Sequence, residues 1–306
     1  MSLSASAPFR EGEEGAIVTR HDDARVHGAG LAADIERLMH AAASRRRSLR
    51  WLFAGAGAVP LASCGGDSGT TAVTSTVSGD TPGTGATTGS TACSVIPEET
   101  GGPYPGDGTN SSNGRVVNAL ALSGIVRSDI RSSIAGANGV AAGVPLTIRL
   151  KMVNVSANCA TVAGATVYLW HCDRNGNYSM YSGSIKEENY LRGVQAADAD
   201  GYVSFLTIFP GCYDGRMPHV HFEVYPTLVS STSAADRVKT SQFTFPLATL
   251  NDVYRADGYA ASVQNLSRIS YATDNVFSDG TALQMASMSG DIVNGYVAEL
   301  TVGVSL

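Results

Sequence analysis

Short segments in which apolar and polar side chains alternate restrict the fold of this chain more than any other feature. Between residues 144 and 155 an apolar side chain falls on every second position, which is the spacing of one face of a β-strand. Comparable segments, separated by Gly, Pro, Asn and Asp, span 165–171, 202–208, 219–225, 241–245 and 296–304. A hairpin turn is expected at 198–201, and weak helical patterns occur near 249–259 and 282–287. The pattern predicts an all-β protein, a sandwich or a barrel.

Composition and charge narrow the class of protein further. The chain has 306 residues and 43% hydrophobic residues, which is enough to bury a sizeable core. Its formal net charge is −6. Phosphate backbones and anionic membrane surfaces require clustered Lys and Arg, so we expect neither nucleic acid nor a bare membrane surface as a partner.

The N-terminal 64 residues have the order of an export signal. Consecutive arginines at 45–47 precede an apolar run at 51–60, and Leu61-Ala-Ser-Cys64 follows. The run is too short for a permanent membrane helix, whereas the paired arginines resemble a twin-arginine signal and Leu61 to Cys64 resembles a lipobox with Cys64 as the acylated residue. The alternative is a chance cysteine in an ordinary signal peptide. Met39 is a candidate for the true start, because the signal lies deep in the chain.

Two further regions follow the signal. Residues 65–92 consist almost wholly of Gly, Ser, Thr, Ala, Asp and Pro, a composition that predicts a flexible tether. Residues 93–306 are expected to form one domain. The prediction is therefore an exported protein of the periplasm or cell envelope that meets a membrane only through a lipid anchor.

The histidines after Cys64 suggest a metal site. They number three, and two of them form His219-Val-His221. Because strand side chains repeat every two residues, both imidazoles should project from one face and could bind one metal ion. A His-x-His pair alone fits zinc, copper or iron, and it also occurs by chance.

The residues around this pair resemble those of the intradiol ring-cleavage dioxygenases, the family of catechol and protocatechuate dioxygenases. The segment reads Pro210-Gly-Cys-Tyr213-Asp-Gly-Arg216-Met-Pro-His219-Val-His221, and Gly-Asn-Tyr178 lies upstream. The family has a second tyrosine about 35 residues after the first, and then an Arg three positions before His-x-His. The resemblance is strongest over 164–242 and extends weakly to 97–104. It implies a β-sandwich of two mixed sheets with long active-site loops and few short helices.

The resemblance also implies a cofactor and a reaction. Non-haem Fe(III) would be held by Tyr178, Tyr213, His219 and His221, with Tyr178 and His219 equatorial and the other two axial. Two phenolate oxygens are hard anionic donors that suit ferric iron. A catechol-type substrate and O2 would be the partners, and Tyr213 would leave the metal to accept a substrate proton. The expected product is a cis,cis-muconate-type diacid.

Three more residues correspond to family positions around the iron. Arg216 would stabilise negative charge on the substrate ring, although it could be an ordinary surface salt-bridge residue. Gln242 would lie beside the iron site, or face solvent from a strand. Tyr104 would line the substrate pocket, or be a buried tyrosine with a satisfied hydroxyl. His171, at a strand end, is expected to be structural.

The remaining cysteines suggest disulfides in an oxidising compartment. Without Cys64 four remain, and three pairings are open. We favour Cys93 with Cys159, because both precede strands outside the metal segments. Cys172 and Cys212 could form a bridge or remain buried thiols.

Two other functions compete with the dioxygenase. A non-catalytic exported β-sandwich lipoprotein could bind a ligand or surface with the same fold. A cupin-like metalloenzyme would need a further carboxylate and a third histidine, for which the sequence offers only His171. No long helical region precedes 97–104, which favours a compact protocatechuate-type core, and assembly into a homo-oligomer stays open.

Overall fold

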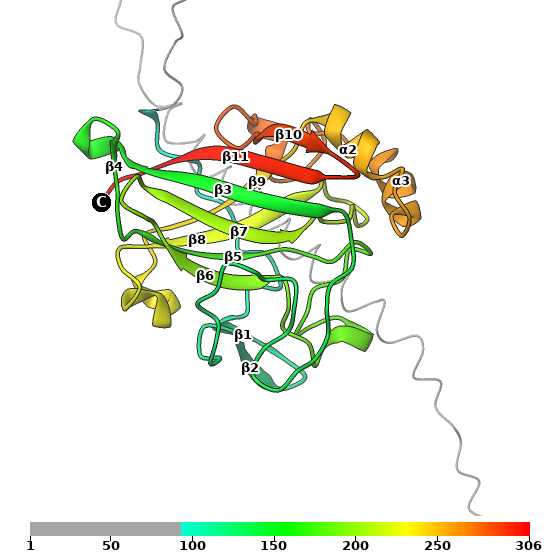
Figure 1. The fold of residues 1–306 in the computed structure, drawn as a ribbon, viewed down its shortest axis with the longest axis horizontal. Coiled ribbons are helices and arrows are strands. Elements are labelled where there is room, and N and C mark those ends of the chain that lie inside the picture. Colours follow the sequence, from blue (N-terminus) through cyan, green and yellow to red (C-terminus); the bar gives the residue numbers. More distant parts are fainter. Residues whose placement is uncertain (1–92) are drawn as a thin grey trace, which may run out of the picture. The chain divides into compact units, whose positions relative to one another are not determined.

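The structure is a computed structural model, and it describes residues 93–306. The expected signal, the lipobox cysteine and the tether lie outside the described residues. Two sheets face each other, and a short hairpin and two helices accompany them (Figure 1). The hairpin consists of β1 (Asp107–Ser112) and β2 (Arg115–Asn118), and the helices are α2 (Leu247–Val253) and α3 (Ala260–Leu266). Among residues 93–306, no helix is long and apolar enough to cross a membrane.

The larger sheet is mixed. Its strands are β3 (Pro145–Asn154), β4 (Ala160–Thr161), β7 (Tyr202–Ile208), β10 (Ser287–Asp291) and β11 (Gly295–Val304). β11 runs parallel to β3, and the other pairs are antiparallel. The parallel pair arises because β11 reaches β3 only after the chain has passed through α2, α3 and β10.

The smaller sheet is antiparallel throughout, in the order β6–β5–β8–β9. Its strands are β5 (Thr166–Trp170), β6 (Arg192–Ala196), β8 (His219–Tyr225) and β9 (Lys239–Thr244). The predicted all-β sandwich with few short helices is therefore confirmed, but only one of its two sheets is mixed.

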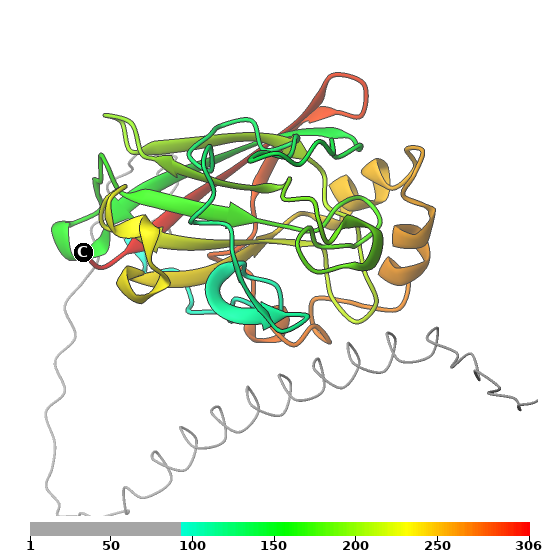
Figure 2. The ribbon, with the colours of Figure 1, turned by 90° about the horizontal axis from the view of Figure 1, so that it is seen from below.

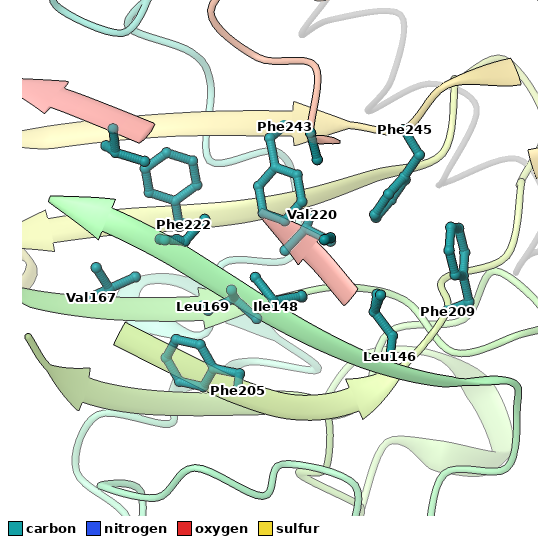
Figure 3. Close-up of a cluster of buried hydrophobic side chains, with 14 of the residues drawn as sticks. Leu146, Ile148, Val167, Leu169, Phe205, Phe209, Val220, Phe222, Phe243 and Phe245 are labelled. Carbon is teal, nitrogen blue, oxygen red and sulfur yellow. The ribbon is translucent and has the colours of Figure 1, made fainter. Parts of the chain in front are cut away.

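The core fills the space between the sheets. Leu146, Ile148, Leu150 and Met152, on the inward face of β3, have no exposed surface. Figure 3 shows the first two of these side chains facing Val220 and other apolar side chains of the smaller sheet. Burying one such side chain contributes about 1.5–3 kcal/mol, so the alternation along β3 is sufficient to fix which face turns inward.

Two local predictions were wrong. Residues 282–287 form a turn and the start of β10, because the Met285 backbone forms a β-bridge with Thr244. The turn at 198–201 exists, and the Asp198 carboxylate accepts the backbone N–H groups of Asp200 and Tyr202. It is not a hairpin, since it connects β6 of one sheet to β7 of the other. α3 was not predicted, and α2 covers only the start of the predicted 249–259 helix.

The N-terminal segment of the domain is tied down at several points. Cys93 and Cys159 form a disulfide with their Cα atoms 5.5 Å apart, the pairing favoured from the sequence. The N–H of Ile96 donates to the Gly303 carbonyl at 2.9 Å, so the chain then runs beside β11. α2 and α3 lie at the end of the domain opposite the C-terminus (Figures 1 and 2).

Candidate metal centre

Strand β8 supplies two imidazoles to one face of the smaller sheet. His219 and His221 alternate with Val220 and Phe222, whose side chains belong to the buried core. Core packing therefore turns both histidines to the opposite face, as the two-residue period predicts. Their Nε2 atoms are 3.1 Å apart, and both side chains are buried.

Two tyrosines reach the same point from separate loops. Tyr178 follows β5, and Tyr213 lies between β7 and β8. The hydroxyl oxygen of Tyr178 is 3.3 Å from His219 Nε2, and that of Tyr213 is 3.2 Å from the same nitrogen. The structure thus brings together all four residues that were predicted as metal ligands.

Glycine allows the two tyrosine loops to approach each other. Gly176 has φ +85°, and a Cβ built at this position would lie 2.7 Å from the Tyr213 Cβ. The Asp173 carboxylate fixes the same turn by accepting the backbone N–H groups of Asn175 and Asn177 at 2.8 and 2.9 Å. A larger residue at position 176 would push the second loop away from the first.

The environment of His219 leaves its Nε2 lone pair available. His219 Nδ1 is 2.6 Å from the Met217 carbonyl and donates to it, which fixes the tautomer. The His221 ring stacks on Trp170 with centroids 5.0 Å apart and an interplanar angle of 3°. Burial lowers the pKa of both histidines well below the usual range. Both rings are therefore neutral near pH 7.

Burial has the opposite effect on the two phenols. It raises the pKa of Tyr178 well above 10, and it raises the pKa of Tyr213 to about 12. Desolvation disfavours the phenolate, so both hydroxyls keep their protons until a cation replaces them.

The donor set fits ferric iron. Two donors bound at about 2.0–2.2 Å to one ion and at right angles to each other are about 3 Å apart, and the observed separations of 3.1–3.3 Å match this spacing. Among residues 93–306, no group of three or more His, Cys, Asp and Glu side chains could hold a metal ion. A metal ion bound by the two imidazoles would also meet the phenol oxygens, which are hard donors suited to a trivalent cation.

Arg216 is a buried residue beside this centre. Its Nε donates to Asp274 Oδ2 at 3.0 Å, and its Nη2 donates to Gln242 Oε1 at 2.7 Å. Gln242 is fully buried on β9, and its Nε2 donates to the Thr100 carbonyl at 2.7 Å. The alternatives of a surface salt-bridge residue for Arg216 and a solvent-facing residue for Gln242 are therefore wrong.

Two residues of this region were missed from the sequence. Asp274 has no exposed surface and also accepts the backbone N–H of Met217 at 2.7 Å. Arg192 is buried, and its guanidinium donates to the carbonyls of Tyr104 and Ser179, both at 3.0 Å. No short motif surrounds either residue, and a lone charged residue gives no sign in the sequence that it is buried.

The remaining candidates separate into residues near the centre and residues away from it. The Tyr104 ring packs against Tyr178, with centroids 4.9 Å apart, and against Tyr181 at 5.1 Å. His171 instead bonds to the Cys172 carbonyl and to the Thr207 hydroxyl, so the third histidine of a cupin-like site is missing from this group. Cys172 and Cys212 are buried free thiols.

Comparisons with known proteins gave matches over the same part of the chain. A family model described as "Dioxygenase" matches residues 128–226, which include all four candidate ligands. A solved intradiol ring-cleavage dioxygenase from Tetranychus urticae has a TM-score of 0.52 at 23% identity, over 70% of this chain and 95% of that one. A chlorocatechol 1,2-dioxygenase from Rhodococcus opacus is 34% identical over 53 residues, which are 17% of this chain and 21% of that protein.

Residues 128–226 are therefore similar to the dioxygenase family that this model describes. The domain has the fold of the solved intradiol ring-cleavage dioxygenase. The aligned stretch spans only about a fifth of the curated chlorocatechol relative.

Proposed function

We propose that the chain is a non-haem Fe(III) enzyme that cleaves a catechol-type ring between its two hydroxylated carbons, using O2 and giving a cis,cis-muconate-type diacid. The observation that carries this proposal is the convergence of two phenol oxygens and two imidazole nitrogens, with His219 Nε2 within 3.3 Å of the other three donors. Bound ferric iron would supply the Lewis acidity that activates a catecholate towards O2.

The chain's own residues would prepare the substrate. Tyr178, Tyr213, His219 and His221 would hold the metal, and Tyr213 would accept a proton from a catechol hydroxyl. Arg216 is fixed by a buried carboxylate and by Gln242, so its remaining guanidinium N–H groups can stabilise negative charge on the ring.

The test combines colour, oxygen uptake and one substitution. Iron-loaded protein should be red from tyrosinate-to-iron charge transfer, and it should consume O2 with members of a catechol panel. Tyr178→Phe should remove the charge-transfer absorption band and the activity. The control is Tyr259→Phe, which changes a buried tyrosine that donates to the Phe209 carbonyl and should retain both. Colourless, inert protein after iron loading would instead support the non-catalytic lipoprotein.

We also propose that the protein is exported and anchored through Cys64. The Cys93–Cys159 disulfide supports an oxidising compartment. Mass spectrometry of the mature N-terminus tests this: a diacylglyceryl group on Cys64 is expected, and an unmodified N-terminus elsewhere would contradict it.

A further inference from the structure

A cavity of about 610 Å³ lies between the β1–β2 hairpin and the loop that follows Tyr178. An apolar cavity of about 150 Å³ is enough to hold benzene. The present cavity therefore has room for much more than one ring, and it falls within the usual range of ligand pockets.

The cavity borders the hydrophobic cluster that packs around Tyr178 of the candidate metal centre. Leu122 and Met180 line the cavity, and both pack in the hydrophobic cluster that contains Tyr178 and Tyr104. Met180 also has φ +70°, a conformation that costs a non-glycine residue about 1–2 kcal/mol. Such strain persists where packing imposes it, and it is frequent at ligand sites.

The cavity also carries positive charge. Arg115 of β2 and Lys186 both line the cavity, together with the single acidic residue Glu187. None of the ion pairs among residues 93–306 includes Arg115 or Lys186. Two cations that line one cavity and have no acidic partner among the described residues favour an anionic ligand.

We propose that this cavity is a substrate subsite that accepts a carboxylate-bearing side chain of the catechol, with Arg115 and Lys186 as the residues that bind the carboxylate. The inference rests on the proposed function, since the ring itself would be held at the metal centre beside Tyr104. The guanidinium fork of Arg115 suits a planar carboxylate, and Lys186 adds a second positive charge.

The experiment compares a charged substrate with an uncharged derivative of it and with the unsubstituted ring. Iron-loaded protein is assayed by oxygen uptake with 3-(3,4-dihydroxyphenyl)propanoate, with its uncharged methyl ester and with catechol. We expect kcat/KM for the acid to exceed that for the ester by about tenfold, chiefly through KM, because the side chain is bound equally in the ground and transition states. The double variant Arg115→Gln/Lys186→Met should remove this preference and leave the ester and catechol unchanged.

The control is Lys151→Met, a lysine on the outer face of the larger sheet, which should keep the preference. A readout without iron uses saturation-transfer NMR of 3-phenylpropanoate on the metal-free protein, where the double variant should lose the signal and Lys151→Met should keep it. If catechol is cleaved but the double variant keeps the preference for the acid, the subsite is refuted. If no catechol is cleaved while the NMR signal depends on Arg115 and Lys186, the proposed function fails and the anion site stands.

Discussion

Iron uptake should release two protons near neutral pH. The Tyr178 and Tyr213 phenols are protonated in the metal-free protein, because burial raises the pKa of the first well above 10 and that of the second to about 12. His219 and His221 contribute no proton, because burial holds the pKa of each well below 6.5. Each phenol must lose its proton to become an anionic ligand.

The sign and size of the pH effect follow from this count. Between about pH 7 and 9 the free protein carries two protons that the iron complex lacks, so raising the pH strengthens binding. With two protons, the apparent Kd should fall about 100-fold per pH unit, which corresponds to about 2.7 kcal/mol. Only well below pH 6.5 should the histidines protonate, because burial lowers the pKa of each, and binding should weaken still more steeply there.

The assay counts protons directly. Ferric nitrilotriacetate is titrated into weakly buffered protein at several pH values, and the proton uptake of the released chelator is subtracted. Tyr213→Phe should lower the count from two to one, whereas Tyr259→Phe, which removes a buried phenol away from the donors, should leave it at two. A count near zero in the unmodified protein would refute the assignment of the two phenols as ligands.

Three further predictions concern the structure around the centre. Gly102→Ala places a Cβ 3.1 Å from His221 Cε1 at a φ of +69°. We therefore expect a loss of about 1–2 kcal/mol in unfolding free energy and weaker iron binding. Unchanged values in chemical denaturation and in iron titration would contradict this. Cys93→Ser/Cys159→Ser opens a loop of 66 residues and should cost about 2–4 kcal/mol in urea unfolding, an effect that should vanish when both proteins are reduced. Arg192→Lys leaves buried carbonyls without donors and should lower the unfolding free energy by about 2 kcal/mol. Amide hydrogen exchange at 104–106 and 178–181 should become faster in the metal-free protein. Unaltered exchange there would show that Arg192 does not hold these segments.

The sequence predicted the strands whose two faces differ. β7 and β8 have the predicted limits, 202–208 and 219–225, because apolar alternation is bounded there by Gly, Pro or Asp. β6 was missed because it begins with a buried arginine and a glycine, which give no alternation. A single backbone bridge between Met285 and Thr244 was enough to override the weak helical pattern at 282–287.

The sequence predicted those site residues that lie in one short motif or that project from the same face of one strand. Arg216 was found by its distance from His219, but its partner Asp274 lies 58 residues further along the chain. Nothing local marks such a pairing, because the loop that carries Asp274 reaches Arg216 only through tertiary packing. The same holds for Trp170, which stacks on His221 from the neighbouring strand.

The two halves of the candidate centre are held by different means. The histidines project from a strand whose other face is core, and His219 is fixed further by the Met217 carbonyl. Tyr178 is buried, whereas Tyr213 is half-buried on a loop whose next two residues are exposed. A ligand on such a loop can move at lower cost than one on a packed strand or in the core. This asymmetry favours Tyr213 over Tyr178 as the donor that gives way to the substrate and takes its proton.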